Sequence, residues 1–185
     1  MAVRALEITA FGFPAACFVC DPTNPTGLRL SFVHDDEAHM VSSEFTLGPD
    51  FSGAPRFVHG GLVLTILDEA MAWAAISIAG RFAVTRTSKA SFRRPVMVDK
   101  THRVEAVVES HDEASVNARA RVLNAAGKRC AEASARLVVL SPATARQAIG
   151  VDLGDGSAYV EAGYLRDTSP SDTVADDSSH GGTTP

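Results

Sequence analysis

The stretch that decides the fold runs from residue 59 to residue 80 and reads HGGLVLTILDEAMAWAAISIAG. It has no proline and no strict alternation of apolar and polar residues, and most of its side chains favour a helix. A helix of about eighteen residues between Gly61 and Gly80 would be about 27 Å long. Because it would be apolar nearly all round, it belongs inside the protein. Its only charged residues are Asp68 and Glu69.

The segments on both sides of this helix alternate apolar and polar side chains with a period of two, which predicts half-buried strands. Two of them precede the helix and four follow it, and the turn at 124–127 joins the last two. An antiparallel sheet wrapped around one long central helix, an α+β fold, is the simplest architecture that hides the helix. The predicted strands are 28–34, 40–47, 84–92, 102–110, 114–124 and 128–140.

Charge is unevenly distributed along the 185 residues. Residues 1–142 carry 15 Lys and Arg against 15 Asp and Glu, whereas residues 143–185 carry 2 against 7. We therefore expect an N-terminal extension at 1–16, a nearly neutral folded domain at 17–142, and an acidic C-terminal tail after it. Beyond about residue 166 the tail is mostly Ser, Thr, Asp, Pro and Gly, a composition that favours disorder.

The composition also argues against several classes of function. The folded domain has no excess of basic residues, which argues against a nucleic-acid partner. The segment with the fewest polar residues, Ala70–Ala79, is too short to span a membrane, and residues 1–16 do not resemble a signal peptide. Three cysteines suit a reducing compartment, so we expect a cytoplasmic protein. Cys17 and Cys20 form a lone CxxC, which predicts small buried thiols and neither a metal site nor a cofactor.

The start of the helix and its two carboxylates are the candidates for chemistry. Gly60 and Gly61 leave backbone N–H groups uncovered at the positive end of the helix, where they can polarise a carbonyl oxygen. Asp68 follows about two turns later on roughly the same side, where it could act as a base or nucleophile. The alternatives are structural: a tight turn for the glycines, and ion pairs at a subunit seam for Asp68 and Glu69.

These residues resemble the hotdog-fold acyl-CoA thioesterases. HGG at 59–61 followed by LDEA at 67–70 is similar to the phenylacetic-acid-pathway (PaaI-like) group and to mammalian thioesterase superfamily members 4 and 5. The opening CFVCDPTNPTGL at 17–28 and SFRRPV at 91–96 also resemble family segments, so the likeness covers about residues 17–141. The loop before HGG lacks an Asn, as in the branch of members 4 and 5.

The resemblance implies hydrolysis of acyl-CoA thioesters to a free carboxylic acid and CoA. The Gly60 N–H would polarise the thioester carbonyl, Asp68 would activate water or attack the thioester carbon, and the Thr85 hydroxyl would orient the water. In such a homodimer, or dimer of dimers, Gly60 of one chain would work with Asp68 of the other. His59 would either fix the loop or contact the substrate. The other residues implied to contact the substrate are Gly61, Glu69, Thr87 on the same strand face as Thr85, Arg93 and Arg94.

Other interpretations of these residues stay open. A non-catalytic acyl-CoA-binding hotdog protein would not need Asp68, and release of acyl chains from a carrier protein would be the same chemistry on another thioester. A hydratase is disfavoured because the helix lacks an Asp-x4-His spacing. Arg93 and Arg94 either end a solvated strand or bind coenzyme A phosphates, for which arginine is well suited.

Overall fold

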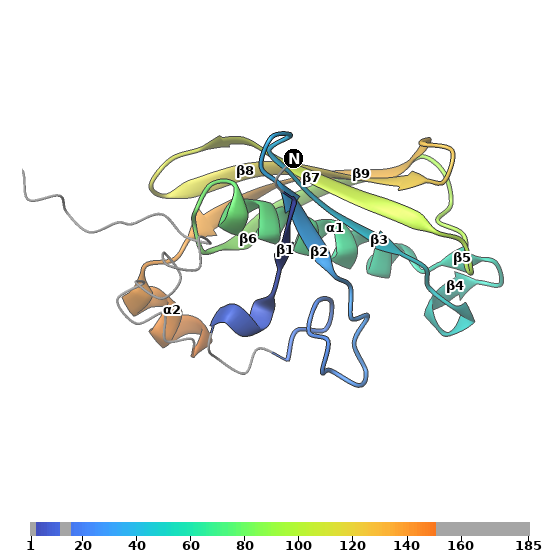
Figure 1. Cartoon of the computed structure of the whole chain (residues 1–185), viewed down its shortest axis with the longest axis horizontal. Helices are drawn as coiled ribbons and strands as arrows, with labels where there is room; N and C mark the ends of the chain where they lie inside the picture. Colours follow the sequence, from blue (N-terminus) through green and yellow to red (C-terminus); the bar gives the residue numbers. More distant parts are fainter. Residues whose placement is uncertain (1–2, 12–15, 151–185) are drawn as a thin grey trace, which may run out of the picture.

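The computed structural model of the protein describes residues 3–11 and 16–150. The long helix α1 lies along one face of a seven-stranded antiparallel sheet, which confirms the expected architecture (Figure 1). The strand order in the sheet is β1-β2-β3-β7-β8-β9-β6, and β4 and β5 form a separate two-stranded ribbon. The elements are β1 (Val3–Leu6), η1 (Ile8–Phe11), β2 (Phe32–Asp35), β3 (Met40–Phe45), η2 (Pro49–Phe51), β4 (Ser52–Ala54), β5 (Phe57–Val58), α1 (Gly60–Ser77), β6 (Ala83–Phe92), β7 (His102–His111), β8 (Ser115–Asn124), β9 (Arg129–Val139) and α2 (Pro142–Ile149).

The core forms where α1 packs against the inner face of the sheet. By length and composition α1 would also suit a membrane span, but half of it is buried inside the protein, as in the core helix of a soluble domain. The sheet meets it with many alanines, whose small side chains let a helix approach the strands closely. The buried side chains are Val63, Ile66, Leu67, Ala70, Met71, Trp73, Ala74, Ala75 and Ile76 on α1, and Val116, Ala118, Ala120, Val122, Ala131, Ala133, Ala135 and Leu137 on β8 and β9.

The start of the chain departs from the sequence prediction. Strand β1 lies inside the extension expected at 1–16 and pairs with β2, so it adds an edge to the sheet. Strand β2 begins at Phe32, later than predicted, because the preceding residues pair with the CxxC loop instead. The Leu30 N–H donates to the Val19 carbonyl at 2.8 Å, and Leu30 is buried there.

The end of the described chain also differs. Residues 142–149 form helix α2, where no element is predicted from the sequence. Ser141 caps this helix by accepting a hydrogen bond from the Thr144 N–H, and Ala145 is fully buried. A helix of only eight residues gives a weak sequence signal because its stability comes from docking. The tail expected to be disordered beyond about residue 166 lies outside the described residues.

Substitution of Ile66, which is 0% exposed in the middle of α1, tests the importance of this packing. Ile66→Ala should lower the free energy of unfolding by about 2–5 kcal/mol, because it removes buried methyl groups and leaves a cavity. The matched variant Ile66→Val should cost only about 0.5–1.5 kcal/mol. Urea unfolding followed by circular dichroism measures both. Equal costs for the two variants would contradict tight packing at this position.

Candidate active site

The start of α1 leaves one backbone N–H group free. The Nδ1 of His59 accepts a hydrogen bond from the Gly61 N–H at 3.0 Å, and the His59 carbonyl accepts hydrogen bonds from the N–H groups of Leu62 and Val63. Within residues 3–11 and 16–150, the N–H of Gly60 donates to no acceptor. A Cβ atom placed on Gly60 would lie 3.8 Å from the ring of Phe92. The side chain of His59 thus occupies the Gly61 N–H, and Gly60 remains as the donor that a ligand can reach.

Asp68 and Thr85 form a direct hydrogen bond. The Thr85 hydroxyl of β6 donates to Oδ1 of Asp68, halfway along α1, at 2.8 Å. Thr85 pairs with the buried Leu137 of β9, so its side chain lies on the inner face of the sheet, toward the helix. Because the hydroxyl uses its proton on Asp68, its oxygen can still accept a hydrogen bond from a water molecule.

Thr87 does not share the face of Thr85, and the expectation that it does is wrong. A β-bulge between Thr85 and Thr87 inserts one extra residue, so Thr87 pairs with the exposed Arg136 of β9. Directly paired residues lie on the same face of a sheet, and the bulge reverses the alternation. Thr87 therefore lies on the outer face, away from Asp68.

The bulge also brings Phe92 to the inner face, beside Gly60. Phe92 pairs with the buried Ala131, although simple alternation from Thr85 would place it outside. The sequence gives no signal for the bulge, so sequence reasoning missed the position of Phe92. The hydrogen bond from Gly61 to His59 was likewise not predicted, although a histidine before two glycines could have suggested a capping residue.

Glu69 lies apart from Asp68, although the two are neighbours in the sequence. Successive helix residues are rotated by about 100°, and Glu69 points toward the CxxC loop, where the Cys17 thiol donates to its Oε1 at 3.5 Å. Burial, with a further contribution from the charge of Cys17, raises the pKa of Glu69 to about 7. The expected contact of Glu69 with substrate thus has no support from this geometry.

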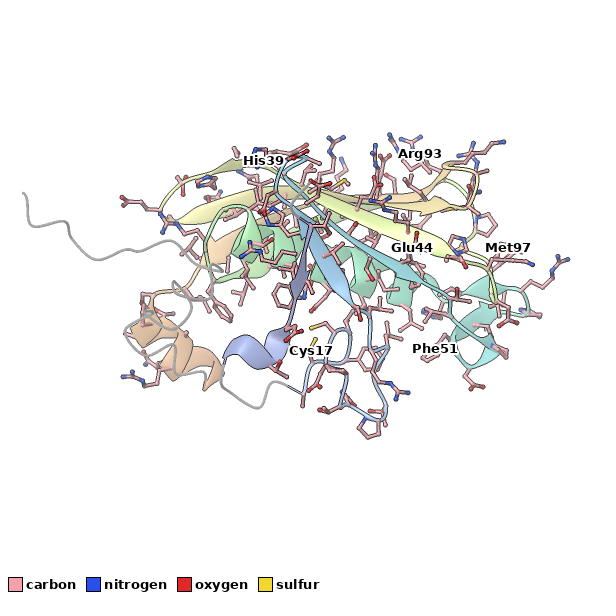
Figure 2. The ribbon with its side chains drawn as sticks, viewed as in Figure 1. Cys17, His39, Glu44, Phe51, Arg93 and Met97 are labelled. Carbon is pink, nitrogen blue, oxygen red and sulfur yellow. The ribbon has the colours of Figure 1, made fainter. Side chains whose placement is uncertain are left out.

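Arg93 and Arg94 follow β6 and also lie apart from Asp68. Arg93 extends from the sheet on the side away from α1 (Figure 2), where its Nε donates to Oε1 of Glu132 at 2.8 Å. Arg94 donates through Nη1 to the backbone carbonyl of Arg129 at 2.8 Å. With Arg121 and Arg129, Arg93 lines a shallow depression of about 500 Å³. This surface is basic but partly neutralised by Glu132.

Comparisons with known proteins agree with this architecture. The family model of the thioesterase superfamily matches residues 56–131, from the loop before α1 to the start of β9. A solved thioesterase superfamily protein is 21% identical with a TM-score of 0.62, and the alignment covers 67% of this chain and 60% of that one. The chain therefore spans less than two thirds of that protein. No curated protein sequence matches the chain.

Two further solved structures are similar over most of their own length. One is a putative thioesterase from Ralstonia eutropha JMP134, a phenylacetic acid degradation-related protein, and it is 24% identical to this chain. The alignment covers 60% of this chain and 86% of that one, with a TM-score of 0.55. A protein from Streptococcus mutans UA159, solved bound to acetyl CoA, is 17% identical, with 56% and 82% covered and a TM-score of 0.52. Residues 56–131 thus match the thioesterase superfamily, and the solved structures share the fold of this chain, which confirms the resemblance expected from the motifs on α1.

Proposed function

We propose that the protein hydrolyses acyl-CoA thioesters, and the observation that carries this proposal is the hydrogen bond between Asp68 and Thr85. A carboxylate in the middle of a largely apolar helix is costly to bury and is typical of a functional site. The hydroxyl of Thr85 fixes its orientation and leaves an acceptor for water. The similarity to a protein solved bound to acetyl CoA supports an acyl-CoA substrate.

The reaction follows from the positions of these groups. The free N–H of Gly60, at the positive end of α1, donates to the thioester carbonyl oxygen and stabilises the negative charge that forms there. Asp68 takes a proton from the water held by Thr85, and the resulting hydroxide attacks the carbonyl carbon. When the C–S bond breaks, the sulfur leaves as the CoA thiolate and recovers the proton. The products are the free acid and CoA.

One chain cannot bring these groups together by itself. Gly60 and Asp68 are eight residues apart on the same helix, a rise of about 12 Å, whereas both must lie about 3 Å from the reacting atoms. We therefore propose that the Gly60 of one protomer and the Asp68 of its partner act on one substrate. A symmetric homodimer would form two such sites.

The edge of the sheet supports this arrangement. Strand β6 pairs only with β9 in the described chain, which leaves its other edge open along ten residues. Its Val84 and Phe92 are 38% and 56% exposed, and unprotected edge strands tend to pair. Antiparallel pairing of two β6 strands about their midpoint near Ser88 would set the Thr85 end of one against the Phe92 end of the other. Because Phe92 lies beside Gly60, this pairing would bring Gly60 toward the partner's Asp68–Thr85 pair.

The first prediction concerns Asp68. Asp68→Asn keeps the size of the side chain but removes the base, and turnover should fall by ~100-fold or more with unchanged fold and oligomeric state. A thiol-release assay over short, medium, long and aromatic acyl-CoAs measures the rate, with Asp36→Asn, in an exposed turn, as the matched control. Wild-type turnover in Asp68→Asn would refute this role. Binding of acyl-CoA without hydrolysis by the wild type would favour a non-catalytic binding protein.

The role of Thr85 is tested with two replacements. Thr85→Val has nearly the same shape but no hydroxyl, so kcat should fall by ~10-fold or more because the water loses its acceptor. Thr85→Ser keeps the hydroxyl and should retain most of the activity. Thr46→Val, which removes an exposed hydroxyl bonded to Thr101, is the control. If Thr85→Val retained as much activity as an active Thr85→Ser variant, the hydroxyl would not be needed.

The shared site is tested by complementation between two inactive variants. Gly60→Pro removes the proposed N–H donor at the first position of α1, where proline is well tolerated. The backbone of His59, with φ −58° and ψ 131°, lies outside the helical region and is compatible with a following proline. Gly60→Pro and Asp68→Asn should each be inactive alone. A mixed dimer of the two regains one intact site, so it should recover up to about half of the wild-type activity.

The mixed dimer is prepared by co-expression with two different tags, and its mass is measured by light scattering. A site built within one chain would give no recovery, because each chain of the mixed dimer lacks one of the two groups. A wild-type protein that is monomeric at micromolar concentration would also overturn the shared site.

A further inference from the structure

A second cluster of polar groups lies on α1, and the proposed hydrolysis does not use it. Sulfur atoms of Cys17 and Cys20 and a carboxylate oxygen of Glu69 all lie within 4.8 Å of one another. Figure 2 shows Cys17 below α1, on the side of the helix away from the sheet. Cys20 is buried, and Cys17 and Glu69 are half-buried, so the cluster is largely shielded from water.

The distances suit a tetrahedral metal ion. Zn²⁺ binds thiolate sulfur at about 2.3 Å and carboxylate oxygen at about 2.0 Å, which puts a sulfur and an oxygen ligand about 3.5 Å apart. The Cys17 sulfur and Oε1 of Glu69 are 3.5 Å apart. Two sulfur ligands would be about 3.8 Å apart, and the sulfur atoms of Cys17 and Cys20 lie within 4.8 Å of each other.

The loop that carries the two thiols is folded to present them together. The Val19 N–H donates to the Cys17 sulfur at 3.3 Å, a contact that stabilises a thiolate. The Leu28 N–H donates to the Phe18 carbonyl at 2.7 Å, which closes the loop. A Cβ atom on Gly27 would lie 2.7 Å from the Phe18 carbonyl oxygen, so only glycine fits here. The CFVCDPTNPTGL motif therefore encodes the conformation of the CxxC turn.

The cluster contains acidic groups that form no ion pair with a basic side chain among the described residues. Among the described residues, Glu69 forms no ion pair with Lys, Arg or His. A half-buried carboxylate beside two thiols is costly to ionise, and a bound cation would compensate its charge. Thiolate ligands favour a borderline-soft ion such as Zn²⁺ over Mg²⁺ or Ca²⁺.

We propose that Cys17, Cys20 and Glu69 bind one Zn²⁺ ion, which fastens the N-terminal loop to helix α1. Binding displaces the protons of the two thiols, and two sulfur ligands and one oxygen ligand leave the fourth position for a water molecule. A lone CxxC predicts no metal site, because it supplies only two ligands. The fold adds the third ligand from a helix that begins more than forty residues later.

The test uses the full chain, freed of metal with a chelator and kept reduced with a phosphine. Titration with Co²⁺ should give a thiolate-to-cobalt charge-transfer band and tetrahedral d–d bands that saturate at one ion per chain, and one equivalent of Zn²⁺ should remove them. Cys17→Ser and Cys20→Ser should each weaken Zn²⁺ binding by more than ~100-fold, and Glu69→Gln by ~10-fold or more. Cys130→Ser is the matched control, because Cys130 lies buried on β9, outside the cluster, and it should leave the stoichiometry at one.

A second measurement uses the wild-type protein, so its result does not depend on whether the variants fold. Zn²⁺ should protect Cys17 and Cys20, but not Cys130, from alkylation measured by mass spectrometry of the peptides. The proposal is overturned if the wild type, with three free thiols by titration, takes up less than about 0.1 Zn²⁺ per chain. Binding that persists unchanged in both Cys17→Ser and Cys20→Ser, or a lack of protection of both thiols, would also overturn it.

Discussion

The burial of α1 against the alanine-rich inner face of the sheet is the constraint on which the rest of the structure depends. Because the strands present small side chains such as Ala118, Ala120, Ala133 and Ala135, the helix lies close to the sheet and its rotation is fixed. Every polar group on the helix then has a set environment. Gly60 at its start stays accessible to a ligand, and Asp68 meets the edge strand.

The two adjacent carboxylates show what a fixed rotation does to neighbouring residues. Asp68 accepts a hydrogen bond from Thr85, whereas Glu69, rotated by about 100°, lies against the thiol of Cys17. The same helix therefore supports two separate proposals, a hydrolytic site shared with a second chain and a metal site that holds the N-terminal loop. Each rests on contacts between elements that are distant in the sequence.

The edge strand β6 links the fold to the proposed reaction. Its bulge keeps Thr85 on the inner face and turns Thr87 outward, and it brings Phe92 beside Gly60. Its open edge is the surface on which a second chain would complete the site. The proposed reaction requires this second chain because Gly60 and Asp68 are separated by about 12 Å along one helix.

The sequence by itself determined the central helix and six strands of the main sheet, because helices and strands that are buried on one side show their characteristic periods in the local sequence. Motif resemblance also predicted Asp68 and Thr85 as site residues, and the structure shows a hydrogen bond between them. Only the tertiary structure decided the face of Thr87, the position of Glu69 beside the CxxC and the docking of α2. These features depend on strand register, helix rotation and contacts between distant segments, and local periodicity carries no information about any of them.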